Sequence, residues 1–380
     1  MPPPMCSAVR RHGSTHGDYA KVVMHPMSSA ASLARRAFLL LAFAAALCSG
    51  WPAPLQAASR EVLYPAVRIA HQGWSRVAIS GDTLVFSDSR VPDEANGRAW
   101  VYRRSGGSWE LEAVLRPPRS LPVDAAFGWT VAISADSIAV AAPPYEVYVF
   151  VRQAPGSWEQ QAAIPVPASQ SAPNFGQVLA MSGDSLLVGA PSAAPSGSSG
   201  GAAYLYNRAG DAWHLNGTFF DSDDTFYGSQ IALAGPLAVV GGGERLDTFL
   251  AGRHGWERQA MVPVSTVITG IALAGDTLAV GAFREGTSFW LFHDGSWTLA
   301  STLPAVSAPL AMDGDLLAAL TASGTLQVYR QAAHASWLLA ATLAEPRADQ
   351  APGFPVSVAL SGGIVAASSY DPVWLFDLDN

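Results

Sequence analysis

Side chains capable of covalent or acid–base chemistry are scarce in this chain and do not stand in catalytic patterns. The two cysteines, Cys6 and Cys48, and the one lysine, Lys21, all lie within the first 57 residues. The five histidines beyond that point show neither His-x-x-x-His nor His-x-His spacing, which a local zinc site would need. No Gly-x-Ser-x-Gly nucleophile elbow stands in a strand-to-helix context, and no phosphate-binding loop is present. We therefore expect no catalytic residue, no metal and no cofactor.

Oxygen ligands for a cation are concentrated in one segment, Asp221-Ser222-Asp223-Asp224. A hard cation such as calcium requires several oxygens around one point, and clustered carboxylates supply them. The alternative is an ordinary solvated polar loop, and we favour it.

The elements that must position such residues follow from a phrase that recurs seven times. Its clearest copy is FGQVLAMSGDSLLVGAP, residues 175–191. The core of the phrase returns at residues 77–87, 131–143, 231–242, 271–282, 310–320 and 358–368. A fixed-period repeat decides the architecture, because each copy builds the same unit. Repeated residues are mostly structural, so function should lie in residues that differ between copies.

Each copy predicts four antiparallel strands. Two apolar runs flank a Gly-Asp pair, and glycine at the first central position of a turn is typical of a type II′ hairpin, because that position needs φ > 0. Ala135 is the exception among the seven copies, and we expect it to be strained. A third strand rich in aromatic and β-branched residues follows a variable loop. The fourth strand begins at a tryptophan that recurs in phase, as Trp109, Trp158, Trp213, Trp256, Trp297 and Trp337.

The spacing of the copies, about 40–55 residues, is that of propeller blades. The seventh copy stops after its third strand, residues 373–378, while a spare strand-like segment occurs at residues 61–67. Pairing the two would close the ring and remove a sheet edge. We therefore predict an all-β fold: a seven-bladed β-propeller of four-stranded antiparallel blades, closed by an N-terminal strand completing the last blade. The in-phase tryptophans would then pack blades together or cover turns.

These phrases resemble the FG-GAP repeats of integrin α-subunit propellers and their bacterial relatives, over essentially all of residues 58–380. The opening pair stands as Phe127-Gly128, Phe175-Gly176 and, loosely, Tyr227-Gly228, and the closing Gly-Ala-Pro is intact at residues 189–191. Calcium-binding members of that family carry an Asp-x-Asp-x-Asp-Gly loop between the first two strands. Here this connection has shrunk to a Gly-Asp turn, so the resemblance does not carry calcium sites to this chain.

The resemblance places ligand binding on the face formed by the loops between second and third strands and by the fourth-to-first connections. Trp74 and Trp129 lie at the start of first strands near this face, where an exposed indole could stack on a sugar or a protein hydrophobe. Ordinary solvation is the alternative for each loop residue. The loop candidates are Asp88, Arg90, Tyr145, Glu146, Arg284, Glu285, Tyr370 and Asp371, with Asp93, Glu94, Arg245 and Asp247 as further members.

Residues 1–57 are predicted to be a leader, with residues 27–57 as the true signal and initiation at Met24 or Met27. Arg35 and Arg36 precede an apolar run, residues 37–48, and small residues follow as far as Ala57-Ala58. This order is typical of a bacterial export signal cleaved near Ala57-Ala58, and the run is too short to span a bilayer. The paired arginines leave both the general and the twin-arginine export routes open.

The formal net charge is −8, and it becomes more negative without the basic leader. An acidic chain disfavours nucleic acid and anionic membrane surfaces as partners. We expect a secreted, periplasmic or cell-surface propeller that binds a protein or a glycan through loops on one face, without catalysis and without a stable membrane span. Two alternatives stay open: a carbohydrate-active enzyme with carboxylates from several blades, and a structural module of the cell envelope.

Overall fold

A computed structural model of the full chain defines the fold from Ser59 onward. The structure describes residues 59–63, 76–89, 97–118, 121–122, 125–167, 172, 174–193, 200–222, 224, 226–264, 266–304, 306–321, 324–332, 336–343, 357–368 and 373–378. These residues all belong to one compact unit, Leu55–Asn380. The predicted leader, residues 1–57, lies outside the described residues. Within the described part, no helix is long and apolar enough to cross a membrane.

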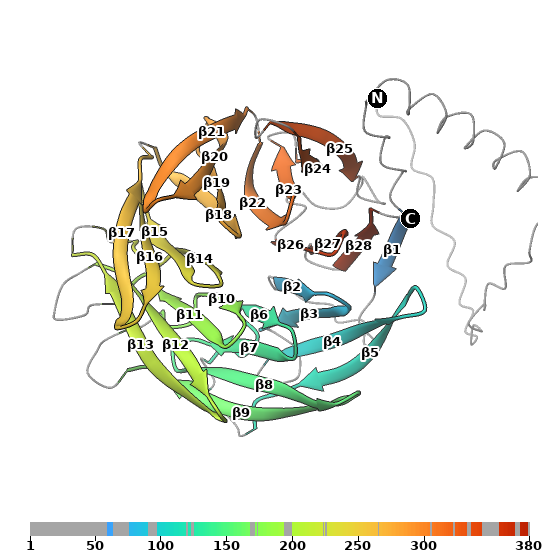
Figure 1. Cartoon of the computed structure of the whole chain (residues 1–380). Helices are drawn as coiled ribbons and strands as arrows, with labels where there is room; N and C mark the ends of the chain where they lie inside the picture. The colour runs from blue at the N-terminus through green and yellow to red at the C-terminus, as the bar shows by residue number, and fades with distance from the viewer. Residues whose placement is uncertain are drawn as a thin grey trace, which may run out of the picture. The chain divides into compact units, whose positions relative to one another are not determined.

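The described residues form seven four-stranded antiparallel sheets, which are the blades of a β-propeller (Figure 1). Blade 1 comprises β2 (Arg76–Ser80), β3 (Thr83–Asp88), β4 (Arg98–Ser105) and β5 (Ser108–Leu115). Blade 2 comprises β6 (Val131–Ser134), β7 (Ser137–Ala142), β8 (Glu146–Ala154) and β9 (Ser157–Pro165). Blade 3 comprises β10 (Val178–Ser182), β11 (Ser185–Ala190), β12 (Ala202–Ala209) and β13 (Ala212–Phe220).

The second half of the ring repeats the same order of strands. Blade 4 comprises β14 (Gln230–Ala234), β15 (Leu237–Gly242), β16 (Arg245–Gly252) and β17 (Gly255–Val262). Blade 5 comprises β18 (Ile268–Ala274), β19 (Thr277–Ala282), β20 (Gly286–His293) and β21 (Ser296–Leu303). Blade 6 comprises β22 (Val306–Asp313), β23 (Leu316–Thr321), β24 (Leu326–Gln331) and β25 (Trp337–Leu343). Blade 7 comprises β26 (Ser357–Ser361), β27 (Ile364–Ser368), β28 (Val373–Asp377) and β1 (Ser59–Leu63).

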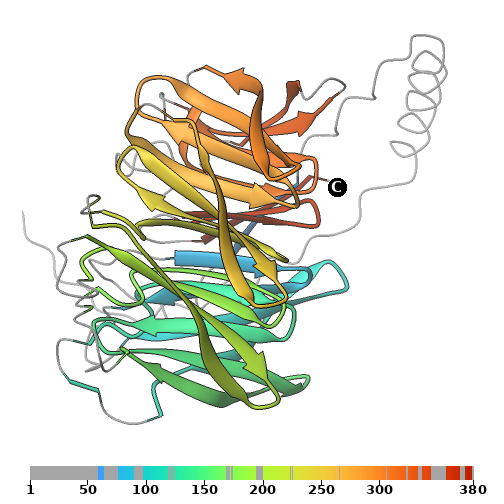
Figure 2. The same cartoon turned by 60° about the vertical axis from the view of Figure 1, so that its left-hand side comes forward.

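The two ends of the propeller meet in blade 7, which confirms the predicted closure. β1 pairs antiparallel with β28 from Ser59↔Asp377 to Leu63↔Val373, as the fourth strand of that sheet. The strand covers residues 59–63, so it begins two residues before the predicted segment 61–67. β2 of blade 1 in turn packs against β26 of blade 7, which completes the ring. Figures 1 and 2 show the first strand of each blade innermost and the blades packed face to face.

Antiparallel pairing divides the connections between the two faces of the ring. The hairpins between first and second strands and the turns between third and fourth strands lie at one face, which we call the turn face. The connections from second to third strands and from fourth to first strands lie at the other, which we call the loop face. Second strands are buried on both sides, as in β3, β7, β15 and β19, because neighbouring blades cover both surfaces.

The hairpins of the turn face have the predicted backbone. The first central residue of each turn has φ between +50° and +57°, and glycine occupies it in six blades. In the remaining blade, blade 2, Ala135 holds this position with φ = 50°, so its predicted strain is confirmed.

We expect Ala135→Gly to raise the free energy of unfolding by a fraction of a kcal/mol up to about 1 kcal/mol, because it relieves the left-handed conformation of alanine. Urea unfolding of the two proteins measures the difference. The control, Ala180→Gly, lies in the middle of β10 and should lose stability. A lower stability for Ala135→Gly would contradict the strain.

A ring of hydrogen bonds joins these hairpins from blade to blade. The N–H of the first turn residue donates to the side chain that ends the first strand of the preceding blade: Ala135 N to Ser80 Oγ (3.1 Å), Gly183 N to Ser134 Oγ (2.9 Å), Gly235 N to Ser182 Oγ (3.0 Å), Gly362 N to Asp313 Oδ2 (2.7 Å) and Gly81 N to Ser361 Oγ (3.1 Å). Ala234 and Ala274 hold the corresponding positions of blades 4 and 5 and offer no acceptor.

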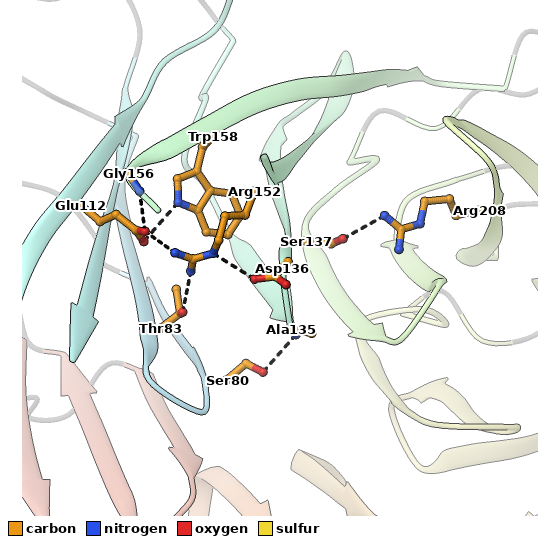
Figure 3. Close-up of polar contacts among 10 residues, drawn as sticks. All are labelled: Ser80, Thr83, Glu112, Ala135, Asp136, Ser137, Arg152, Gly156, Trp158 and Arg208. Carbon is orange, nitrogen blue, oxygen red and sulfur yellow. Dashed lines mark hydrogen bonds and ion pairs between the residues drawn. The ribbon is translucent and has the colours of Figure 1, made fainter. Parts of the chain in front are cut away.

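The junction between blades 1 and 2 shows the full set of ties (Figure 3). Arg152, at the end of β8, donates to Asp136 in its own hairpin, and to Glu112 and Thr83 (Nη2–Oγ1, 2.7 Å) of blade 1. Its guanidinium also lies 4.4 Å from the ring centre of Trp158. The side chains of Arg152 and Glu112 are only 7% and 5% exposed, whereas that of Asp136 is 72% exposed. These contacts of Arg152 therefore hold blade 2 against blade 1.

We expect Glu112→Gln to lower the free energy of unfolding by about 2 kcal/mol, because it leaves the buried Arg152 without its buried counter-charge. Asp136→Asn removes the exposed partner of the same arginine and should cost less than about 1 kcal/mol. Urea unfolding of both variants checks the ranking, which equal losses would contradict.

Candidate functional site

The loop face is built on the Phe-Gly pairs. Phe127, Phe175 and Tyr227 are fully buried beneath it. The glycine that follows each ring has φ of +85° to +87°, and its N–H bonds to the second strand of the same blade, as Gly228 N does to Gly241 O (3.0 Å). A Cβ at Gly228 would lie 2.1 Å from the carbonyl oxygen of Ala202 in blade 3. Glycine is required here by both the dihedral angle and the close approach.

Blade 4 departs from the repeat just below this face. In each blade, one residue of the third strand pairs with the fourth residue of the second strand. This residue is a buried aromatic one in four blades: Trp100, Tyr148, Tyr204 and Trp374. In blade 4 the register places Asp247 there, opposite Val240, and it is 2% exposed. In blades 2 and 3 the Phe-Gly ring packs against the third-strand tyrosine at 5.6 Å between ring centres. In blade 4 an aromatic contact has been exchanged for a carboxylate.

The buried carboxylate of Asp247 is held by three donors. Tyr227 donates through its hydroxyl to Oδ2 (3.0 Å), and Arg258 Nη2 (2.5 Å) and Arg245 Nε (3.3 Å) donate to Oδ1. Arg245 also pairs through Nη1 with Asp221 Oδ2 (2.5 Å). A buried charge needs such compensation, since an unpaired one costs several kcal/mol. The polar cluster of Asp221, Tyr227, Arg245, Asp247 and Arg258 thus ties the fourth-to-first connection to β16 and β17.

The local charges change how these groups titrate. Burial raises the pKa of Tyr227, and the Asp247 carboxylate beside it raises it further. Burial by itself would lower the pKa of Arg245, but Asp247 and Asp221 outweigh it and raise the pKa. Arg245 therefore stays charged beside its two acidic partners.

The carboxylate of Asp224 in the same region is only partly compensated by hydrogen bonds. Its Oδ1 accepts a hydrogen bond from Phe226 N (2.9 Å), while its buried Oδ2 has no hydrogen-bond partner among the described residues. Burial raises the pKa of Asp224, and the nearby Asp221 and Asp247 add to the increase. The acidic segment considered as a cation site is thus engaged locally, Asp221 by Arg245 and Asp224 by its own loop, and Asp223 lies outside the described residues. Among the described residues, no three acidic, histidine or cysteine side chains are grouped to hold a metal ion.

Three exposed apolar side chains lie on loop-face connections of blades 4 and 5. Phe226, Val267 and Phe283 are 63%, 50% and 54% exposed, and we call them the apolar row. Their backbones form one chain of contacts across blades 4 and 5. The Phe226 carbonyl abuts Gly242, Ile268 N donates to Gly243 O (2.9 Å), and Phe283 N donates to Val267 O (2.9 Å).

The sequence-predicted residues fall into two separate groups. In blade 2, Trp129 and Glu146 are half-buried and Tyr145 is at the surface. In blade 5, Arg284 and Glu285 are exposed next to Phe283, and the guanidinium of Arg284 lies 5.0 Å from the centre of that ring. Arg284 adopts φ = 65°, a strained conformation for a residue other than glycine.

The remaining predicted residues do not extend these groups. Asp88 is 2% exposed within β3, and Asp247 is buried in the polar cluster, so neither is a surface loop residue. Trp74, Arg90, Asp93, Glu94, Tyr370 and Asp371 lie outside the described residues.

The apolar row was missed from the sequence because exposed and buried apolar residues look alike in an apolar repeat. A signal was available at Phe226. The residue before the Phe-Gly ring is Ala126 in blade 2 and Asn174 in blade 3, so a second large ring at that position is a departure from the repeat.

The described residues form a seven-bladed β-propeller with three exposed apolar side chains, Phe226, Val267 and Phe283, on connections of its loop face. Residues 158–206, from β9 to β12, match the family model described as the FG-GAP repeat. The buried Phe-Gly pairs and the seven closed blades agree with this match and fit a propeller similar to the FG-GAP propellers of integrin α-subunits. No curated protein sequence matches the chain.

Solved structures similar to this chain support the fold. A chain in the crystal structure of the Mitotic Checkpoint Complex is 15% identical with a TM-score of 0.54, covering 83% of this chain and 90% of that one. A protein from Lactobacillus plantarum is 14% identical with a TM-score of 0.53, over 70% and 83% of the two chains. The computationally designed Ika8 protein is 12% identical with a TM-score of 0.52, over 84% and 100%. At such identities the likeness concerns the fold alone.

We expect Asp224→Asn to stabilise the protein at pH 7. The raised pKa means that the folded state takes up a proton more readily than the unfolded state, so Asp224 opposes folding when charged and ceases to do so below its unfolded pKa of about 3.8. The gain in free energy of unfolding should therefore shrink as the pH falls from 7 towards 4. Asp82→Asn, at an exposed hairpin, is the control and should show little change at either pH. A gain that grows with acidity would contradict the assignment.

Proposed function

We propose that the protein is an exported, non-catalytic binding module that recognises a partner protein through the apolar row on its loop face. The observation that carries this proposal is the exposure of Phe226, Val267 and Phe283 on connections of blades 4 and 5 whose backbones contact one another. Contiguous exposed apolar residues with a polar rim are typical of interaction sites, whereas single ones are normal on any surface.

The structure beneath the row is suited to binding. The backbone at Phe226, Val267 and Phe283 is hydrogen-bonded within the fold, and the polar cluster with Asp247 holds the connection that carries Phe226. A surface that is already rigid loses little conformational entropy on association, so more of the contact energy appears as affinity. Arg284 and Glu285 supply charged groups at the edge of the row, as expected for the rim of an interface.

A carbohydrate-active enzyme is the second candidate, and the polar cluster argues against it. Acid–base cleavage of a glycoside needs two carboxylates free to take and give protons. Asp221 and Asp247 are each paired with arginine, and Asp247 is buried. The acidic groups brought together in the described part of blade 4 are therefore engaged in holding the loop.

Export remains part of the proposal and rests on the leader sequence, residues 1–57. The pattern of Arg35-Arg36, the apolar run and Ala57-Ala58 supports a secreted, periplasmic or cell-surface protein. The binding experiment is accordingly designed for extracytoplasmic material.

Binding is tested by capture from envelope and culture fractions with the immobilised protein, followed by the affinity of the captured partner. Phe226→Ser and Phe283→Ser should each weaken binding at least about tenfold, since truncating a central apolar contact costs more than 1 kcal/mol. The controls, Leu111→Ser and Leu339→Ser, remove exposed apolar side chains from outer strands and should leave affinity unchanged. Equal affinity for all four variants would overturn the role of the row, and a blank capture by the folded protein would overturn the proposal.

A further inference from the structure

Two kinds of contact join blade 1 to blade 2 and blade 2 to blade 3, and both are absent between blades 3 and 4 in the part of the chain that the structure describes. The first is the arginine at the end of the third strand. Arg152 reaches Thr83 of blade 1, and Arg208 reaches Ser137 of blade 2 (3.3 Å), as Figure 3 shows. The corresponding residue of blade 4 is Ala251, whose N–H bonds to its hairpin at Pro236 O (2.8 Å), as Arg152 and Arg208 do to theirs. No side chain therefore crosses from this position to Ser185 of blade 3.

The second lost tie involves the recurrent tryptophan. The fourth strands of blades 1 to 6 each have a bulge, and in blades 1 and 2 the side chain of the bulge residue accepts the indole N–H of the next blade: Trp158 Nε1 donates to Glu112 (3.2 Å), and Trp213 Nε1 donates to Gln161 (3.0 Å). In blade 3 the bulge residue is the shorter Asn216.

Asn216 turns to its own blade instead. Its Nδ2 donates to Asn207 Oδ1 (2.7 Å), and Asn207 Nδ2 donates to Ser185 Oγ (2.6 Å). Trp256 is half-buried, and its Nε1 has no hydrogen-bond partner among the described residues. The indole N–H that ties blade 2 to blade 1 and blade 3 to blade 2 is thus available at this junction.

A cavity of about 520 Å³ opens at this place on the turn face. Ser185, Asn207, Asn216, Ala251 and Trp256 line it, with Arg253 and His254 from the turn between β16 and β17. The volume lies within the range of small-ligand sites, about 300–1,000 Å³. The site arises directly from the two substitutions, because a long side chain at either position would occupy it.

The lining indicates the class of ligand. A half-buried indole offers an apolar π face, and two amides and a hydroxyl offer neutral donors and acceptors beside it. A sugar ring needs this combination, since its C–H face is apolar and each hydroxyl both donates and accepts hydrogen bonds. Arg253 adds a positive charge and no carboxylate is among the lining residues, which disfavours a cationic amino sugar.

We propose that the cavity between blades 3 and 4 is a saccharide-binding site, with Trp256 as the stacking platform and Asn207 and Asn216 as the polar contacts. The site lies on the turn face, opposite the apolar row. It is independent of the proposed protein binding, because none of its lining residues belongs to the loop face.

The experiment titrates the full protein with methyl β-D-glucoside, D-glucuronate and D-glucosamine, and follows indole N–H signals by NMR. The glucoside or the glucuronate should shift the Trp256 signal, assigned by its loss in Trp256→Phe, and glucosamine should bind most weakly. Trp256→Phe should weaken binding at least about tenfold. The matched control, Trp213→Phe, removes an indole whose N–H is already bonded to Gln161 and should change affinity less than about twofold.

A second variant keeps the test independent of lost packing. Ala251→Arg restores the residue type of the earlier blades and should abolish saccharide binding while the protein keeps or gains thermal stability. Ala212→Arg adds the same charge at the exposed first residue of β13 and should bind as the unmodified protein does. Absence of any shift with all three sugars, equal effects of the two tryptophan variants, or undiminished binding by Ala251→Arg would each overturn the proposal. Protein capture by the apolar row should be unaffected by Ala251→Arg, which separates the two hypotheses.

Discussion

The structure depends on the junctions between blades. Each four-stranded sheet has two apolar surfaces, and only the neighbouring blades can cover them, so no blade is stable without the ring. Apolar packing is not directional, and polar ties fix how the blades meet: serine on the turn hairpins, arginine at the end of third strands, and tryptophan against the bulge of the preceding blade. The junction of blades 1 and 2 has all three, centred on the buried pair of Arg152 and Glu112 (Figure 3). The pairing of β1 with β28 then closes the ring.

Blade 4 departs from blades 1 to 3 at three positions, and two of these departures lie at or beneath the candidate sites. Asp247 replaces a buried aromatic residue and draws two arginines and a tyrosine to the loop face. Ala251 replaces an arginine and opens the cavity on the turn face. Ala234 replaces a serine, and a mostly apolar cavity of about 520 Å³ lies beside it at the junction with blade 5. The arginine at the end of the third strand is likewise absent from blades 5 to 7, where Phe292, Gln331 and Leu378 hold its position. Blades can lose such ties because the closed ring still holds each of them on both sides.

The repeat was sufficient to predict the blades, the closure and the strain at Ala135, because these follow from local periodicity and turn chemistry. It was insufficient for the sites. The apolar row depends on which apolar residues remain uncovered, and the repeat marks Tyr227 as the buried ring without showing that Phe226 before it is exposed. The role of Trp256 depends on a hydrogen bond that is missing between its indole N–H and Asn216, which lies 40 residues earlier in the chain. Only aligning the copies by strand register shows that the expected partner has become too short.

The polar cluster beneath the loop face and the cavity on the turn face share one strand. β16 begins at the loop face with Arg245 and ends at the turn face with Ala251-Gly252, so it links the two regions. Allosteric coupling would require that strand to have two arrangements with different affinities at each end. Its central residues, 246–249, are buried, paired to β15 and β17 along their length, and packed against the neighbouring blades. A strand held in this way transmits little movement, so the geometry favours independent binding of the two proposed ligands, one at each face.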